Sequence, residues 1–204
     1  MKGLLLVAFC AAIIATAPIV AAADHVIILG AALSLSGKYA LSGAHTKNGY
    51  NLALRRLNKR GGVAIAGTPY ELVIKYYDDE STPARGTELA ERLIKQDGVK
   101  YILGPFGSGQ TKAMLPVIEK YRAPMVEANG AARELFTKGY RHVFAVLSTS
   151  EQYLAPAIAL AAKHAEKLGK KPSQIKCALA MGDEPFAQDV RAGGWMTSNG
   201  TAWL

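Results

Sequence analysis

A short glycine-rich loop is the part of this chain whose residue types could do binding chemistry. It joins a predicted strand, Val99 to Leu103, to a predicted helix that starts near Ser108 or Gly109. Gly104, Gly107 and Gly109 allow the backbone to turn tightly, and the first N–H groups of a helix have no partner within the helix. Together with the Ser108 hydroxyl, these N–H groups could bind an anion.

The spacing of this loop fits two interpretations. Gly104-x4-Gly109-Gln110-Thr111 has the glycine spacing of a phosphate-binding P-loop, but Gln110 stands where the lysine that reaches the phosphates should be. A nucleotide site is therefore disfavoured. The alternative is a turn without a ligand, because strand-to-helix turns in α/β domains often contain glycine and serine. The loop alone leaves an anion site and a plain turn open.

Catalytic and metal chemistry have weaker support. The four histidines, His25, His45, His142 and His164, are scattered, and no nucleophile–base pair is recognisable. The acids of Asp78–Glu80 could be metal ligands, but adjacent residues of a strand point to opposite faces. Charges at the start of the next helix are the favoured interpretation. We therefore expect no catalytic residue, no metal and no cofactor.

The elements that would position the loop alternate regularly between strand and helix. Strands are predicted at residues 25–33, 71–77, 99–103, 123–126 and 142–147, with helical patterns between them. This order predicts an α/β fold in which helices cover both faces of a parallel sheet. Three loops of small residues would then meet at the carboxyl edge of the strands: Ser34–Gly43, Gly104–Gly109 and Ala128–Ala131. Such loops supply backbone N–H donors rather than nucleophiles.

The pattern restarts beyond Ser148. A helix is predicted at residues 153–168, a strand at 175–181 and a further helix at 187–191. Residues 192–204 show neither a helical nor a strand period, and they contain both tryptophans of the chain.

Composition fits a protein with a hydrophobic core. Half of the residues are hydrophobic, and the formal net charge is +8. The basic residues are dispersed, and the only tight group is Lys163, Lys167, Lys170 and Lys171 near the end of a predicted helix, where cations suit the helix dipole. We interpret this charge as a solvated surface, and no nucleic acid partner is expected.

The first 23 residues have the pattern of a secretory signal peptide. Lys2 precedes an apolar run from Leu4 to Val20, and the small residues Ala21–Ala23 follow. We therefore expect cleavage after Ala23 and a periplasmic location.

Two other interpretations of this segment are disfavoured. A membrane anchor needs ~20 apolar residues, and Thr16 and Pro18 interrupt the run. A lipoprotein attached through Cys10 is disfavoured by the bulky Phe9 before it. Cleavage would leave Cys177 as the only cysteine, so no internal disulfide is expected.

The order of short motifs is similar to that of a known family. These motifs are Leu35-Ser-Gly, Gly43, Gly49, Asn58, Gly61-Gly62, Asp78-Asp79, Gly98-Val, Leu103-Gly-Pro, Ser108 and Tyr121-Arg-Ala-Pro. Together they resemble the type I periplasmic solute-binding proteins, and most closely the leucine/isoleucine/valine-binding branch that serves ABC importers. The resemblance runs from about Val26 to Arg191. It implies two α/β lobes that close on a ligand.

The resemblance also implies a ligand site. Ser108, between Gly107 and Gly109, matches the serine that holds the ligand carboxylate. Asn129 and Ala131 fall where the family offers a backbone carbonyl and a hydroxyl-bearing residue. Ala131 lacks that hydroxyl, which would weaken the hold on an α-amino group.

Two further positions complete the implied site. Ser42 falls where branched-chain binders often have an aromatic residue, and Phe186 falls where the second lobe contributes one. The expected domains are the signal peptide, a ligand-binding lobe at 24–146 and the start of a second lobe at 147–191. Residues 192–204 depart from the family pattern. We therefore expect an incomplete second lobe, in a truncated or frame-shifted product.

The implied function is binding without chemistry. The resemblance predicts the extracytoplasmic substrate-binding component of an ABC importer, which binds an amino acid or a related small carboxylate and docks on a membrane permease. One alternative is the ligand-sensing lobe of an extracytoplasmic receptor, which shares the fold. An exported hydrolase is a second alternative, for which no catalytic pair is recognisable.

Overall fold

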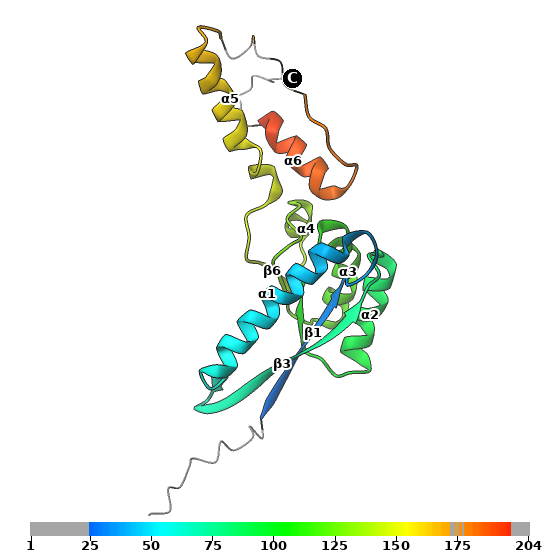
Figure 1. The fold of residues 1–204 in the computed structure, drawn as a ribbon. Coiled ribbons are helices and arrows are strands. Elements are labelled where there is room, and N and C mark those ends of the chain that lie inside the picture. The colour runs from blue at the N-terminus through cyan, green and yellow to red at the C-terminus, as the bar shows by residue number, and fades with distance from the viewer. Residues whose placement is uncertain (1–24, 172–173, 175, 177, 197–204) are drawn as a thin grey trace, which may run out of the picture.

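The computed structural model describes residues 25–171, 174, 176 and 178–196. The predicted signal peptide at 1–23, Cys177 and residues 197–204 lie outside the described residues. A six-stranded sheet forms the body of the protein, in the order β2-β3-β1-β4-β5-β6 (Figure 1). The strands are β1 (Val26–Leu33), β2 (Val63–Ile65), β3 (Thr68–Asp78), β4 (Tyr101–Leu103), β5 (Met125–Glu127) and β6 (Val143–Ala145).

Helices cover both faces of this sheet, as the sequence predicts. The longer helices are α1 (Ala40–Lys59), α2 (Pro83–Lys95), α3 (Ser108–Tyr121), α5 (Ala155–Lys167) and α6 (Pro185–Met196). One short α-helix, α4 (Glu134–Thr137), and two 3-10 turns, Gly37–Tyr39 and Ser150–Gln152, complete the described elements. Helix α1 lies on one face, and α2 and α3 pack together on the other (Figure 1). No described helix is long and apolar enough to cross a membrane.

The sheet is mixed rather than purely parallel, which corrects the prediction. Strand β2 pairs antiparallel with β3, and the remaining pairs are parallel. The hairpin turns at Ala66 and Gly67, both of which have positive φ. A three-residue strand between the Gly61-Gly62 helix stop and Pro69 gives too short a pattern to be recognised in the sequence.

The main core lies between the sheet and the α2–α3 pair. Ile102 and Met125 of the central strands point into it, together with Leu93 of α2 and Met114 of α3. Leu89, Leu93 and Ile94 follow a helical period along α2, so one side of this amphipathic helix faces the sheet.

Helix α1 begins earlier than predicted. The sequence places Ser34–Gly43 in a loop, whereas the structure has helix from Ala40, so Ser42 and Gly43 are helical. A Cβ atom on Gly43 would lie 1.8 Å from the Ser34 carbonyl oxygen, which shows that the glycine permits close helix–strand contact rather than a turn. The predicted helix stop at Gly61-Gly62 is confirmed, and both glycines have positive φ.

The segment after β6 is helical. The predicted helix at 153–168 is confirmed as α5. Of the predicted strand at 175–181, residues 175 and 177 lie outside the described residues, and the described residues 176 and 178–181 are not in a strand. Helix α6 runs to Met196, so the expected break after Arg191 is wrong for the next five residues. A Cβ atom on Gly193 would lie 1.7 Å from the Glu151 carbonyl oxygen, so this glycine allows α6 to approach the preceding turn.

Candidate functional site

The candidate site lies next to β1, where successive strands change from one side of the sheet to the other. From β1 the chain passes to β3 on one side and then crosses to β4 on the other, which makes the β1–β4 boundary a topological switch point. In open α/β sheets, ligands bind outside the carboxyl ends of the strands at such a point. The segments that follow β4 and β5 reach this edge and face the first half of α1.

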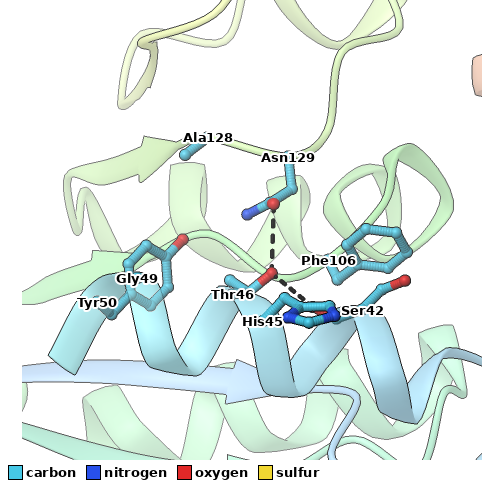
Figure 2. A pocket seen from close by; sticks show the side chains of 8 residues that line it. All are labelled: Ser42, His45, Thr46, Gly49, Tyr50, Phe106, Ala128 and Asn129. Atoms are coloured by element: carbon cyan, nitrogen blue, oxygen red, sulfur yellow. Dashed lines mark hydrogen bonds between the residues drawn. The ribbon is translucent and has the colours of Figure 1, made fainter. Parts of the chain in front are cut away.

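An open hollow of about 540 Å³ occupies this edge. Its lining consists of Ser42, His45, Thr46, Gly49, Tyr50, Phe106, Ala128 and Asn129 (Figure 2). Five of these residues come from α1, and the others follow β4 and β5. The volume falls within the range of small-molecule pockets. The lining contains no carboxylate, lysine or arginine, so apart from the titratable His45 imidazole it offers uncharged hydrogen-bonding groups and apolar surface.

Asn129 connects the two sides of the hollow. Its Oδ1 lies 3.3 Å from the Thr46 Oγ1, and that hydroxyl also lies 3.0 Å from the Ser42 carbonyl oxygen (Figure 2). Thr46 is buried, whereas Asn129 is half-buried with its carboxamide at the hollow. A carboxamide has both donor and acceptor groups, so Asn129 can meet either a ligand oxygen or a ligand N–H.

Tyr50 also lines the hollow from α1. Its hydroxyl donates a 2.9 Å hydrogen bond to the Gly104 carbonyl oxygen, which ties α1 to the end of β4. Burial raises the pKa of Tyr50, and the nearby Glu127 charge raises it further. The ring therefore acts as a neutral wall at all physiological pH values.

Ser108 lies at the start of α3 as predicted, and its hydroxyl oxygen accepts hydrogen bonds from the loop after β5. Its Oγ accepts hydrogen bonds from the backbone N–H groups of Ala131 and Ala132, each at 3.1 Å. The residue is 2% exposed and does not line the hollow. Ser108 therefore fixes the segment after β5, and in this arrangement its two lone pairs are occupied by that segment.

Of the other residues predicted for the site, some line the hollow and some do not. Ser42 and Asn129 line it, whereas Gly107, Gly109 and Ala131 do not. Gly107 is the N-cap of α3 with a φ of 90°, a backbone conformation that glycine adopts readily. Ala131 is buried and accepts a 2.8 Å hydrogen bond from the Ser150 N–H through its carbonyl oxygen.

Phe186 is outside the hollow. It lies on α6 and packs edge-on against Tyr153, with ring centroids 5.8 Å apart. Near the hollow, the aromatic contact is instead between Phe106 and Tyr39, whose ring centroids are 5.6 Å apart. Asp189 of α6 accepts hydrogen bonds from the Arg133 N–H and the Ser150 hydroxyl, and these bonds join the later segment to the loop after β5.

Asp78, the last residue of β3, and Asp79 hold the loop that follows β1 in place. Asp78 accepts hydrogen bonds from the N–H groups of Leu35, Ser36 and Glu80. Burial acts to raise the pKa of Asp78, but these bonds and that from the Ser36 side chain outweigh it and lower the pKa. Burial raises the pKa of Asp79, which accepts from the Ser34 hydroxyl at 2.7 Å. Across the described residues, no group of three or more potential metal ligands is found.

Of the eight lining residues, sequence reasoning identified only Ser42 and Asn129 as site residues; the six that it missed are His45, Thr46, Gly49, Tyr50, Phe106 and Ala128. His45, Thr46 and Tyr50 lie three, four and eight residues after Ser42 on α1, so they share one side of that helix. Polar residues at such spacing usually mark a solvent-exposed side, which is why the signal was not recognised. A second hollow, which Val99, Tyr101 and Ala123 help to line, lies at the amino ends of β4 and β5, away from the edge where ligands bind.

Comparisons with known proteins agree on the family. A family model described as periplasmic binding protein matches residues 26–194, so the match continues three residues beyond Arg191. A Leu/Ile/Val-binding protein homolog 8 from Brucella abortus is 30% identical over 162 residues. That alignment covers 79% of this chain and 39% of the relative, so this chain spans well under half of the relative's length.

Solved structures show the same fold. A solute-binding protein of an ABC transporter from R. palustris, in complex with 4-hydroxybenzoate, is 26% identical with a TM-score of 0.67, covering 85% of this chain and 44% of that one. The branched-chain amino acid binding protein LivJ from Streptococcus pneumoniae, in complex with isoleucine, is 24% identical with a TM-score of 0.57, covering 66% and 39%. This chain therefore belongs to the type I periplasmic binding proteins, in the family of the leucine/isoleucine/valine-binding proteins.

Proposed function

We propose that this chain provides the first ligand-binding lobe of an extracytoplasmic solute-binding protein of an ABC importer, and that its hollow binds a small carboxylate. The observation that carries the proposal is the Asn129 carboxamide at the hollow, at the switch point of the sheet. The family consists of solute-binding proteins of transport systems, not of enzymes.

The chemistry of the lining favours a ligand with an anionic head and an apolar body. The Asn129 carboxamide offers a donor suited to a carboxylate. Phe106 and Tyr50 offer aromatic surface for the body of the ligand. Ala131 has no hydroxyl to accept from an α-amino group, so an aromatic acid suits this lobe at least as well as an amino acid.

The partner and the location belong to the same proposal. A membrane permease would receive the ligand, and the segment 1–23 would direct export. Of the residues carried over from the family resemblance, Ser42 and Asn129 would contact the ligand. Ser108, with Gly107 and Gly109, would hold the surrounding backbone, and Phe186 would face the ligand only after a lobe movement.

Ligand titration followed by NMR tests the proposal. We expect 4-hydroxybenzoate or leucine to shift the amide signals of Thr46, Asn129 and Phe106, with a Kd of about 1 mM or weaker, because a hollow open to water cannot protect its hydrogen bonds. The uncharged analogue 4-hydroxybenzyl alcohol should bind more weakly than the acid.

A matched pair of variants locates the site. Asn129→Ala should abolish the shifts, whereas Asn48→Ala, at an exposed position of α1, should leave them unchanged. Shifts that survive Asn129→Ala, or that map to the second hollow near Tyr101, would overturn the assignment.

A further inference from the structure

Glu127 is a fully buried acid directly behind the wall of the hollow. It is the last residue of β5 and precedes Ala128 and Asn129, which line the hollow. Its side chain is 0% exposed. Of the described ion pairs, none includes Glu127, so its charge has no compensating cation. A buried acid of this kind needs a structural explanation.

The carboxyl group holds the segment after β5 from below. Its Oε1 accepts hydrogen bonds from the N–H groups of Asn129 and Gly130, both at 2.7 Å. Its Oε2 lies 2.7 Å from the Thr111 Oγ1 on α3. One side chain therefore links the wall of the hollow to the first turn of α3.

Counting hydrogens shows which form of the acid fits these contacts. The Thr111 Oγ1 lies 2.7 Å from the Glu127 Oε2 and 2.9 Å from the Gly107 carbonyl oxygen, but a hydroxyl has a single hydrogen. If Glu127 is ionised, both neighbours are acceptors and must share that hydrogen in a three-centre bond, which is weaker for each of them. If Glu127 is protonated, its Oε2–H donates to Thr111, and Thr111 donates to Gly107. Each contact then has its own hydrogen.

Solvent cannot supply the missing hydrogen, because Thr111 is also 0% exposed. The backbone nearby leaves room for the acid and for little else. A Cβ atom on Gly104 would lie 2.5 Å from the Glu127 Oε2, and one on Gly130 would lie 2.4 Å from the Thr111 Oγ1. Two glycines are thus needed for the acid and the threonine to meet in this space.

The electrostatics agree with the hydrogen count. Burial raises the pKa of Glu127 to about 7, although the N–H groups of Gly130 and Asn129 and the Thr111 hydroxyl oppose this shift. From α1, the titratable group that senses Glu127 is Tyr50, which stays neutral. From α3 and from the segment after β5, the groups that contact Glu127 are an uncharged hydroxyl and backbone amides.

We propose that Glu127 is a positioning residue of the hollow: as a neutral acid it ties the segment 128–131 to the first turn of α3, and its ionisation weakens binding of an anionic ligand. The ligand part of this inference rests on the proposed function. Two effects act together when the proton leaves. The Thr111–Gly107 bond competes with the Thr111–Glu127 bond, and a negative charge appears behind the Asn129 wall.

A glutamine at this position imitates the neutral acid. In Glu127→Gln, the carboxamide oxygen can accept from the N–H groups of Asn129 and Gly130, and the NH2 group can donate to Thr111. The variant should therefore hold the segment as the protonated wild type does, at every pH. Glu88→Gln is a matched control, because Glu88 is an exposed acid of α2 that pairs only with Arg85.

NMR titration of the complete chain from about pH 5 to about pH 9 tests the positioning role without any ligand. We expect the Glu127 carboxyl carbon to titrate near pH 7, and the amides of Asn129 and Gly130 to shift with the same midpoint. In Glu127→Gln these amides should stay at their low-pH positions. A Glu127 midpoint near the ordinary glutamate pKa, or variant amides that match the high-pH wild type, would overturn the inference.

Variants of Thr111 provide a second test that does not depend on Glu127→Gln. Thr111→Val removes the hydroxyl with little change in shape, so the amides at the start of α3 should no longer respond to the titration of Glu127. Thr111→Ser keeps the hydroxyl and should retain the response. Equal responses in both variants would show that the hydroxyl does not carry the connection.

Binding of 4-hydroxybenzoate separates this inference from the proposed function. The chain with Glu127 and the Glu127→Gln variant both carry His45→Gln in this experiment, because the His45 imidazole lines the hollow and is itself titratable. With Glu127 present, we expect about fivefold or more weaker binding at pH 8 than at pH 6, and with Glu127→Gln no such difference. By linkage, the ligand should raise the Glu127 midpoint. Equal affinity at both pH values with Glu127 present would overturn the effect on binding. Titrating amides with no binding by any variant would instead reject the proposed function and leave the positioning role supported.

Discussion

The two faces of the central sheet are covered to very different degrees. On the face of α2 and α3, Ile102, Met125 and Leu93 are at most 1% exposed. On the face of α1, strand alternation places Tyr101, Val126 and Phe144, which remain between 40% and 53% exposed. The first face thus holds the stabilising core, and the second has the hollow at its carboxyl edge.

This difference separates stability from binding in physical terms. Helix α1 buries only Gly43 and Thr46, and it is attached largely through polar contacts, including those of Tyr50, Asn51 and Asn58. A helix held in this way contributes less hydrophobic stabilisation than α2, whose buried side is apolar. The lining of the hollow can consequently be polar without loss of the core.

Truncation of a core leucine should have the largest effect. Leu93→Ala on α2 removes a side chain that is 0% exposed, and we expect a loss of about 3 kcal/mol in the free energy of unfolding. Leu52→Ala on α1, where the leucine is 44% exposed, should cost less than about 1 kcal/mol. Urea unfolding of both variants measures the difference. Equal losses would show that the two faces contribute alike.

Much of this comparison could be predicted from the sequence, but not the site. The apolar period of Leu89, Leu93 and Ile94 is strong enough to predict α2 and its buried side. The predicted start of α1 was wrong because Ser42 and Gly43 are residues that favour loops. The reason that Gly43 is helical, its close packing on Ser34, depends on tertiary structure. Local pattern cannot show such long-range contacts.

The acid at the border of the two faces was missed for a similar reason. Glu127 precedes a run of small residues, and a glutamate there usually points to solvent. Only the fold brings Thr111, Gly104 and Gly130 around it. The same holds for the backbone partners of Ser108, which the sequence places at the start of a helix without showing what its side chain contacts. Its two N–H partners come from a loop 23 and 24 residues later.

Glu127 should give the second largest effect, and its sign depends on pH. Its pKa is about 7 in the folded protein and near the ordinary value of 4.5 when unfolded. Between these values the folded state binds more protons, so the contribution of Glu127 to stability falls as pH rises from about 4.5 to about 7 and is constant above that. Glu127→Gln removes this loss, and above pH 7 it should be up to about 3 kcal/mol more stable than the wild type.

The difference between the two stability–pH curves is the quantity to measure, because other groups titrate in both proteins. Asp79 has a raised pKa, whereas Asp97 and Glu91 have lowered ones, and all of these terms cancel in the difference. We expect the two proteins to have equal stability near pH 4.5. A difference that grows towards acid would contradict the assignment.

Ser108→Ala should have the third largest effect. It leaves the N–H groups of Ala131 and Ala132 without their acceptor in a buried place, and we expect a loss of about 2 kcal/mol in the free energy of unfolding. Amide hydrogen exchange at these two residues should accelerate as well. Ser148→Ala, at an exposed serine, is the control and should change neither quantity. Unchanged exchange in Ser108→Ala would show that its hydroxyl does not hold this segment.

Phe144→Ser should have the smallest effect on stability, and it tests the contrast between the two faces of the sheet on the face of α1. The phenylalanine is 53% exposed on the face of α1, so its replacement should change the free energy of unfolding by less than about 0.5 kcal/mol. The same change removes apolar surface that lies next to Val126 on the adjacent strand.

The fluorescence of a dye that binds exposed apolar surface should therefore decrease in Phe144→Ser. Lys100→Ser, at an exposed position before β4, should leave this fluorescence unchanged. If Phe144→Ser destabilises the protein as much as Leu93→Ala does, the face of α1 must be packed in solution, and the contrast between the two faces would be lost.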